Sequence, residues 1–164
     1  MGASRISVAV DGSGNLYLAD GPNNRCRLIA PDGIITTIAG NGSSNFSGDG
    51  GPAIDAGTPG EDDCVPDSAG NLYLPNVSRV RMINTAGIIT TIIGTGVSGF
   101  SGDGGPAASA ALAFPTGVAV DASGNLFIAD NGNNRIRKVS AGGIISTVAG
   151  NGNYGFSGDG GPAA

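Results

Sequence analysis

An internal repeat is the feature that most constrains the fold of this chain. The segment Phe-Ser-Gly-Asp-Gly-Gly-Pro-Ala begins three times, with spacings of 54 and 56 residues, at Phe46, Phe100 and Phe156. The segment Gly-Ile-Ile has the same two spacings and begins at Gly33, Gly87 and Gly143. A period of about 55 residues indicates one supersecondary unit that occurs three times, with neighbouring copies burying each other's apolar faces.

Each unit contains four short runs that are typical of strands. In the last copy these runs are rich in Val and Ile, are bounded by Gly, Asn and Asp, and cover residues 117–121, 125–130, 135–139 and 144–149. The 31 glycines and 9 prolines approach a low-complexity composition, but 40% of the chain is apolar and the repeats are in register. Four antiparallel strands in each repeat predict an all-β fold of β-propeller blades.

The same residues carry a resemblance to a known family. Gly117-Val-Ala-Val-Asp, Gly124-Asn-Leu-Phe-Ile-Ala-Asp and Asn134-Arg-Ile-Arg-Lys-Val resemble the NHL repeat, and Gly155-Phe-Ser-Gly-Asp-Gly-Gly-Pro resembles the linker of a bacterial subgroup. The resemblance implies an NHL-type β-propeller of three four-stranded antiparallel blades, half of a six-bladed ring. We expect one segment over residues 1–164, with blades at about 5–40, 61–94 and 115–150 and linkers at 41–60, 95–114 and 151–164.

The middle copy departs from the other two. Its first strand reads Cys64-Val-Pro-Asp, and a proline inside a strand predicts a bulge or a weakened edge. In the repeat register, Cys26 occupies the position of Val80 and Ile136, and Cys64 occupies the position of Val8 and Val118. We therefore interpret both cysteines as small core residues; a disulfide between them is possible, but nothing in the pattern requires it.

Three blades do not close a ring, because closed propellers have about 4–8 blades. Two apolar blade faces are then left without a neighbour. A second copy of the chain could complete a six-bladed ring with twofold symmetry, since one chain's end and another's start nearly rebuild a linker. Alternatively, the missing blades belong to a longer chain of which this is a fragment. Both interpretations stay open.

Charge and composition narrow the functional classes. With 8 basic and 13 acidic residues, a net charge of −5 and no basic run, the chain is a poor surface for nucleic acid or an anionic membrane. The absence of histidine removes Ser-His-Asp catalysis and histidine-dependent zinc chemistry. No signal peptide is visible, so an extracellular or cell-surface location is implied only by the family resemblance.

The repeated linkers supply the first candidate functional residues. Asp49, Asp103 and Asp159 each lie in a glycine-flanked loop that could contact a ligand or, through carboxylate and carbonyl oxygens, Ca²⁺. We favour a tight turn in which the preceding phenylalanine fills the seam between blades and the aspartate caps backbone N–H groups. Asn131 and Asn133, in the turn at 131–134, are further candidates for ligand or partner contact.

Other carboxylates and arginines offer weaker alternatives. Glu61, Asp62 and Asp63 form the one acidic cluster and are the candidate metal ligands, near the central channel of a ring. The segments 11–15 and 121–125 superficially resemble a calcium loop, but we expect hairpin turns. Arginines two apart share one strand face. The first arginine of a pair could bind the preceding aspartate, which predicts the ion pairs Arg25–Asp20 and Arg135–Asp130.

Taken together, these features favour a non-enzymatic binding or scaffold module that presents its rim loops to a protein or small ligand. The partners we expect are that ligand and either a second copy of the chain or the missing blades, with no nucleic acid and no membrane. We expect no cofactor, Ca²⁺ being the one possibility. The alternative is a metal-dependent (Ca²⁺-type) lyase or lactonase-like enzyme with an axial carboxylate and amide site, as the resemblance implies for some relatives. An RNA-binding role is disfavoured by the sequence pI of about 4.3.

Overall fold

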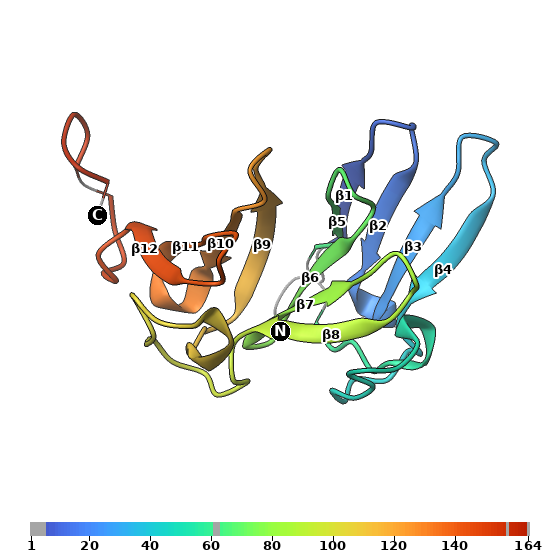
Figure 1. Ribbon diagram of the computed structural model, residues 1–164, viewed down its shortest axis with the longest axis horizontal. Coiled ribbons are helices and arrows are strands. Elements are labelled where there is room, and N and C mark those ends of the chain that lie inside the picture. The colour runs from blue at the N-terminus through green and yellow to red at the C-terminus, as the bar shows by residue number, and fades with distance from the viewer. Residues whose placement is uncertain (1–5, 61–62, 157, 164) are drawn as a thin grey trace.

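The computed structural model describes residues 6–60, 63–156 and 158–163, which form three four-stranded antiparallel sheets (Figure 1). The first sheet consists of β1 (Ile6–Val10), β2 (Leu16–Asp20), β3 (Arg25–Ile29) and β4 (Ile35–Ala39). The second consists of β5 (Val65–Pro66), β6 (Leu72–Asn76), β7 (Arg79–Ile83) and β8 (Ile89–Ile93). The third consists of β9 (Pro115–Val120), β10 (Leu126–Asp130), β11 (Arg135–Val139) and β12 (Ile145–Ala149). Short 3₁₀ turns lie at Gly21–Asn23, Ala53–Asp55, Ala107–Ser109 and Asn131–Asn133.

Strand order within each sheet follows the order of the chain, so each repeat is one up-and-down blade. The three sheets lie side by side in an open arc with the first and third at its two ends (Figure 1). This confirms the predicted architecture, three four-stranded blades of a β-propeller. Strand β5 has only two residues and contains Pro66, as the proline in this position predicted. Among the described residues, no helix has the length and apolar character needed to cross a bilayer.

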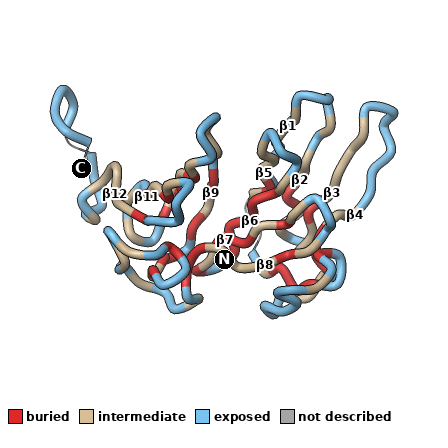
Figure 2. Tube along the Cα trace, viewed as in Figure 1, coloured by how far each residue is buried: buried red, intermediate tan, exposed pale blue. Residues whose placement is uncertain are grey.

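The hydrophobic core lies between the blades rather than within one of them. One buried cluster joins the first and second blades and includes Ala19, Leu74 and Ile89. A second cluster joins the second and third blades and includes Val80 and Ile128. Figure 2 shows the buried backbone concentrated where neighbouring sheets face each other. A single sheet cannot bury both of its faces, so each blade depends on its neighbour for stability.

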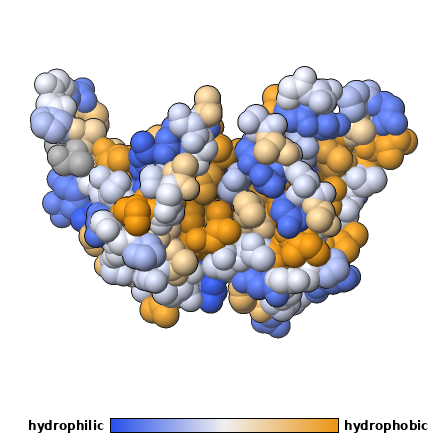
Figure 3. All heavy atoms as spheres, viewed as in Figure 1, coloured by the Kyte–Doolittle hydropathy of each residue, from blue (hydrophilic) through white to orange (hydrophobic). Residues whose placement is uncertain are grey.

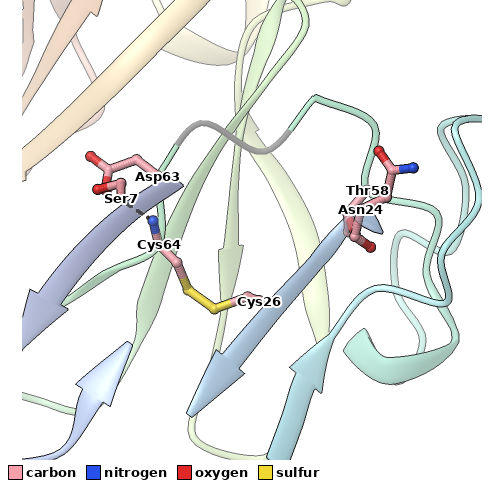
Figure 4. The surroundings of a disulfide bond; sticks show 6 residues. All are labelled: Ser7, Asn24, Cys26, Thr58, Asp63 and Cys64. Carbon is pink, nitrogen blue, oxygen red and sulfur yellow. Dashed lines mark hydrogen bonds between the residues drawn. A yellow bond between two sulfur atoms is a disulfide. The ribbon is translucent and has the colours of Figure 1, made fainter. Parts of the chain in front are cut away.

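A disulfide joins Cys26 in β3 to Cys64, which immediately precedes β5 (Figure 4). Both side chains are buried, and beside them Thr58 Oγ1 donates a hydrogen bond to the Asn24 carbonyl at 3.0 Å. This corrects the interpretation of the two cysteines as ordinary core residues. The physical reason is their register: each stands at one of two repeat positions that face each other across a seam, and the disulfide fixes the first blade to the second.

Candidate functional site

The turn between the first two strands of each blade is held by one aspartate. Asp11 Oδ1 accepts hydrogen bonds from the backbone N–H groups of Ser13 and Asn15, at 2.9 and 3.0 Å, and its Oδ2 accepts one from the Asn15 side chain at 2.8 Å. Asp121 makes the equivalent bonds in the third blade. The hydrogen bond from the Asn15 side chain is the main reason that the pKa of Asp11 lies below its ordinary value. The two calcium-loop-like segments are therefore hairpin turns, as expected.

In the first and second blades a tyrosine joins this turn: Tyr17 donates from its hydroxyl to Asp11 Oδ2 at 3.1 Å, and the tyrosine of the second blade is buried. Tyr73 donates a hydrogen bond from its hydroxyl to Asp67 Oδ2 at 3.1 Å, beside the bond that the Asn71 side chain donates at 2.9 Å. Burial raises the pKa of Asp67, but these bonds outweigh it and hold the pKa below its ordinary value. Burial, with the neighbouring Asp67 carboxylate, raises the pKa of Tyr73 to about 12. Tyr73 is part of the core between the second and third blades.

The linker aspartates pair with buried arginines of the following blade. Arg81 is fully buried and forms an ion pair with Asp49 at 2.7 Å. Its remaining N–H groups donate to the carbonyls of Ser47 and Gly57, at 2.9 and 3.0 Å. The ring of Phe46, from the same linker, lies under the Arg81 guanidinium, 4.7 Å from its Cζ. The linker thus holds the second blade through charge, backbone and aromatic contacts at once.

The third blade repeats this arrangement with an additional carboxylate. Arg137 is buried and contacts Asp103 at 2.6 Å and Asp130 at 3.3 Å. Burial raises the pKa of Asp103, but hydrogen bonds from Thr147 and Arg137 reverse this and lower it. The structure corrects the predicted ion pairing here, because Asp130 binds the second arginine of its blade and not Arg135. The first arginine of each pair points instead to backbone carbonyls of its own blade and of the linker that follows it, such as those of Asn133 and Asn151 for Arg135.

In the first blade, too, the predicted ion pair is replaced. Asp20 accepts two hydrogen bonds from the Asn23 side chain, at 2.9 and 3.0 Å. Arg25 donates to the carbonyls of Asn23 and Asn41, and no ion pair joins Arg25 to Asp20 in the described part of the chain. Across the turn of four residues between Asp20 and Arg25, the guanidinium faces backbone carbonyls and not the aspartate.

The remaining candidate contact residues lie at the third blade. Asp159 is exposed. Asn133 donates from its side chain to the Gly99 carbonyl and to Asp130 Oδ2, each at 2.8 Å, so it has a structural role. Asn131 is exposed at the same turn. The structure therefore pairs Asp49 and Asp103 with the seam arginines, although both carboxylates stay partly exposed, and leaves Asp159 and Asn131 exposed.

Of the three candidate metal ligands, only Asp63 is within the described residues; Glu61 and Asp62 lie outside them. Asp63 Oδ1 accepts a hydrogen bond from Ser7 Oγ at 2.8 Å (Figure 4), and its Oδ2 accepts a longer one from the Val118 backbone at 3.4 Å. Asp63 thus connects the innermost strands of the first and third blades. Within residues 6–60, 63–156 and 158–163 there is no group of three or more metal-ligating side chains.

Two exposed apolar residues with left-handed backbone were missed by the sequence analysis. Val77, in the turn between β6 and β7, has φ +47° and is 45% exposed. Phe114, directly before β9, has φ +47° and is 59% exposed. Bulky and β-branched residues avoid this region of backbone space. The signal that could have found Phe114 is its register, since Gly60 holds the equivalent position at φ +63°.

A hollow of about 420 Å³ lies between the second and third blades. Tyr73, Met82 and Ile92 line one side, and Leu126 and Val139 line the other. Figure 3 shows apolar side chains gathered over this gap. The hollow is bordered by the turns at 124 and 140–143 and by linker residues 106–108, and neither Val77 nor Phe114 lines it.

Comparisons with known proteins point to one type of repeat. The family described as the teneurin NHL domain matches residues 96–158. Teneurin-1 of Mus musculus is 38% identical over 74 residues, which covers 39% of this chain and 3% of the relative. The chain therefore corresponds to a very small part of that relative's length.

Solved structures extend the similarity to nearly the whole chain. A protein of unknown function from Bacteroides thetaiotaomicron matches with a TM-score of 0.65 and 25% identity, covering 88% of this chain and 36% of that one. Virginiamycin B lyase from Staphylococcus aureus matches with a TM-score of 0.56 and 16% identity, covering 88% of this chain and 41% of the lyase. The chain spans less than half of either structure.

Proposed function

We propose that this chain, a β-propeller segment built of three NHL repeats, is a non-enzymatic binding module that holds a protein or small ligand on one rim. We call this surface the rim patch and define it as Val77, Phe114 and Asn131. The observation that supports it is the pair of exposed apolar side chains held in left-handed backbone, Val77 and Phe114. The proposal keeps Asn131 as a contact residue and adds two that the sequence did not suggest.

The topology brings these three residues to the same rim. Strands alternate in direction, so the turns that follow β6 and β10 lie on the side where the linkers enter β9. The N–H of Gly132 donates to the Ala113 carbonyl at 2.8 Å, so the turn that carries Asn131 lies against the residue before Phe114. Strand β6, which ends just before Val77, packs against β9, which begins just after Phe114.

The backbone strain supports a role in recognition rather than in folding. Holding a non-glycine residue in the left-handed region costs about 1–2 kcal/mol, more for a β-branched side chain. Gly60 shows that glycine serves at the position of Phe114 without that cost. Strained residues with exposed apolar side chains are common at ligand-contacting surfaces, since the fold gains nothing from them. An exposed apolar surface with an amide beside it suits an extended peptide.

The charge and the disulfide add to the proposal. A net charge of −5 favours partners other than nucleic acid or anionic membrane. The buried Cys26–Cys64 disulfide suits an oxidising compartment, in keeping with an extracellular or cell-surface module. The remaining blades of the ring come from a second copy or from further repeats of a longer chain.

A second candidate function, a metal-dependent lyase, is favoured by the similarity to virginiamycin B lyase. One structure of that lyase is a catalytically inactive variant in which a histidine is replaced by alanine. This chain has no histidine. A related reaction here would therefore need other residues, with Asp63 as the described candidate.

Selection from a random-peptide phage library tests the binding proposal. The wild-type chain is the target, and the Phe114→Gly variant, which adopts the residue found at Gly60, is the comparison. We expect enriched peptides that bind the wild type and lose at least about tenfold in affinity on Phe114→Gly, because the aromatic contact is gone while the backbone is kept. Ile54→Gly, which removes another exposed apolar side chain, is the control. Equal binding to wild type and Phe114→Gly would refute the rim patch.

Calorimetry with Ca²⁺ tests the enzyme candidate. Wild type and an Asp62→Ala/Asp63→Ala variant are compared at neutral pH. Heat of binding in the wild type that is lost in the variant would support a metal site at this position. No heat in the wild type would remove the Ca²⁺-dependent candidate and leave the rim patch unaffected.

A further inference from the structure

We propose that the outer face of the first blade is a docking site for the last blade and last linker of a second copy of this chain, joined head to tail. The inference goes beyond the rim patch because it names a partner and the residues that recognise it. It rests on contacts that the two internal seams already display. The free faces at the two ends of the arc carry the two halves of the same contact set.

The two internal seams share one pattern, which we call the seam contacts. A linker phenylalanine lies against the two arginines of the next blade: Phe46 on Arg79 and Arg81, at 4.2 and 4.7 Å, and Phe100 on Arg135 and Arg137, at 3.9 and 4.7 Å. The linker aspartate then pairs with the second arginine. The pattern needs a linker from one repeat and an arginine pair from the following repeat.

The first blade carries the arginine half of the seam contacts without a linker. Arg25 and Arg27 occupy the positions of Arg79 and Arg81. The Nε of Arg27 is buried and has no hydrogen-bond partner among the described residues, as is also true of Arg137 Nε in the occupied second seam. Unlike Arg81 and Arg137, however, Arg27 forms no ion pair with any described carboxylate. In the second blade, the equivalent Nε of Arg81 donates to Asp49 at 2.9 Å. A buried donor without an acceptor is costly, so the Arg27 guanidinium is suited to an incoming carboxylate.

The last linker carries the other half. Phe156 is 86% exposed, whereas Phe46 and Phe100, which stack on arginines of the next blade, are 39% and 43% exposed. Asp159 is exposed, and no ion pair involves it in the described part of the chain. A carboxylate and an aromatic ring at one end of the arc thus match a guanidinium pair at the other.

The apolar faces match in the same register. Cys26 and Cys64 meet at the first seam as a disulfide. At the second seam, the equivalent residues Val80 and Val118 lie in one buried cluster. At the open ends, the same two positions are held by Ile136, 37% exposed, and Val8, 60% exposed.

Both end faces expose apolar side chains. Ile6, Val8 and Val10 alternate along β1 on one side, and all three are exposed. At the other end, a shallow hollow of about 250 Å³ is lined by residues that include Ala129, Ile136 and Ala149. The equivalents of these three in the first blade, Ala19, Cys26 and Ala39, are fully buried by the second blade. A blade with Val8 in front would fill the hollow in the same way.

Two copies suffice to close the assembly. Head-to-tail contacts close only when the rotation per subunit completes a circle. Two arcs of three blades give six, which lies within the range of closed propellers. Both end faces are then covered, and each chain contributes one arginine half and one linker half to the two new seams.

Disulfide cross-linking in a mixture tests the head-to-tail geometry. Val8→Cys and Ile136→Cys are made in separate full-length chains and mixed under air oxidation, with Ile144→Cys as the control partner for Val8→Cys. The Cys26–Cys64 disulfide shows that this pair of register positions can be bridged. When Val8→Cys is mixed with Ile136→Cys, we expect a band at twice the 15.9 kDa of the chain on a gel run without reductant. When Val8→Cys is mixed with Ile144→Cys, this band should be at least about tenfold weaker. Equal bands with both partners, or cross-linking of Val8→Cys to itself alone, would overturn the proposal.

Charge exchange tests the recognition itself by light scattering during size exclusion. We expect the wild type to have twice the mass of one chain. Arg27→Glu and Asp159→Arg should each raise the dissociation constant of the dimer at least about tenfold, and the variant that carries both changes should recover the wild-type affinity. Asp55→Arg, an exposed aspartate away from both end faces, is the matched control and should leave the mass unchanged. A wild-type monomer at every concentration would overturn the second copy as the partner. Peptide binding to the rim patch is read separately, so the two proposals fail independently.

Discussion

The disulfide between the first two blades offers the sharpest test of how the blades depend on one another. We consider Cys26→Val/Cys64→Val, which replaces the cross-link with the pair of valines that the next seam uses at Val80 and Val118. Both cysteines are buried, so valine keeps apolar contact at the seam. The variant removes the covalent bond while leaving the type of packing nearly unchanged.

The magnitude follows from the length of the closed loop. The two cysteines are 38 residues apart. Chain-entropy arithmetic for a loop of this length gives a loss of about 4 kcal/mol in the free energy of unfolding. For a chain of this size, that corresponds to a decrease of about 8–16 °C in Tm.

Urea unfolding followed by circular dichroism, at one fixed protein concentration, measures the effect. Wild type and variant are compared with and without reductant, and the free energy of unfolding is extrapolated to water. We expect reductant to lower the stability of the wild type to about that of the variant and to leave the variant unchanged. A difference below about 1 kcal/mol between oxidised wild type and variant would show that the cross-link does not constrain the unfolded chain as argued.

Three further predictions follow from individual contacts. Val77→Gly should raise the free energy of unfolding by about 1 kcal/mol. Val77 is the first central residue of the β6–β7 turn and has positive φ, which glycine adopts without strain. Lower stability of the variant in urea would contradict this. Asp49→Ala should lower the free energy of unfolding by about 2 kcal/mol, since buried Arg81 loses the carboxylate that it pairs with. Asp49→Asn should lower it less, because its amide oxygen can still accept a hydrogen bond from Arg81. The lowered pKa of Asp67 adds stability above its ordinary value of 3.8 that is lost as pH falls through the native pKa. The raised pKa of Tyr73 adds stability that is lost between its ordinary value of 10.0 and about 12. Tyr73→Phe should reduce the alkaline part in a pH series of thermal melts, and the raised pKa of Tyr17 should account for what remains.

The repeat made the architecture predictable. Strand-like runs of four to six residues, bounded by turn residues and repeated in register, required sheets that stack on one another. The prediction held even for the short strand at Pro66. Turn chemistry was predictable for the same reason, because Asp11 and Asn15 act within one local segment whose bonds do not depend on the rest of the fold.

Contacts between repeats were predicted less well. The sequence placed phenylalanine at the seams, which the structure supports, but it assigned the linker aspartates to backbone capping and Asp130 to the wrong arginine. The two arginines of a pair share a strand face, so spacing alone cannot tell which one turns toward the incoming linker. The preceding linker decides this, because Arg81 and Arg137 are completely buried and pair with its aspartates, Asp49 and Asp103.

By itself, then, the sequence determined the blade, its turns and the number of copies, because these depend on short-range patterns of apolar and turn-forming residues. Only the tertiary structure decided which carboxylate faces which guanidinium, that Cys26 and Cys64 are joined, and that Val77 and Phe114 remain exposed in strained backbone. These features depend on how residues from different repeats meet in space. One copy of a repeat holds no information about the neighbour that will cover it.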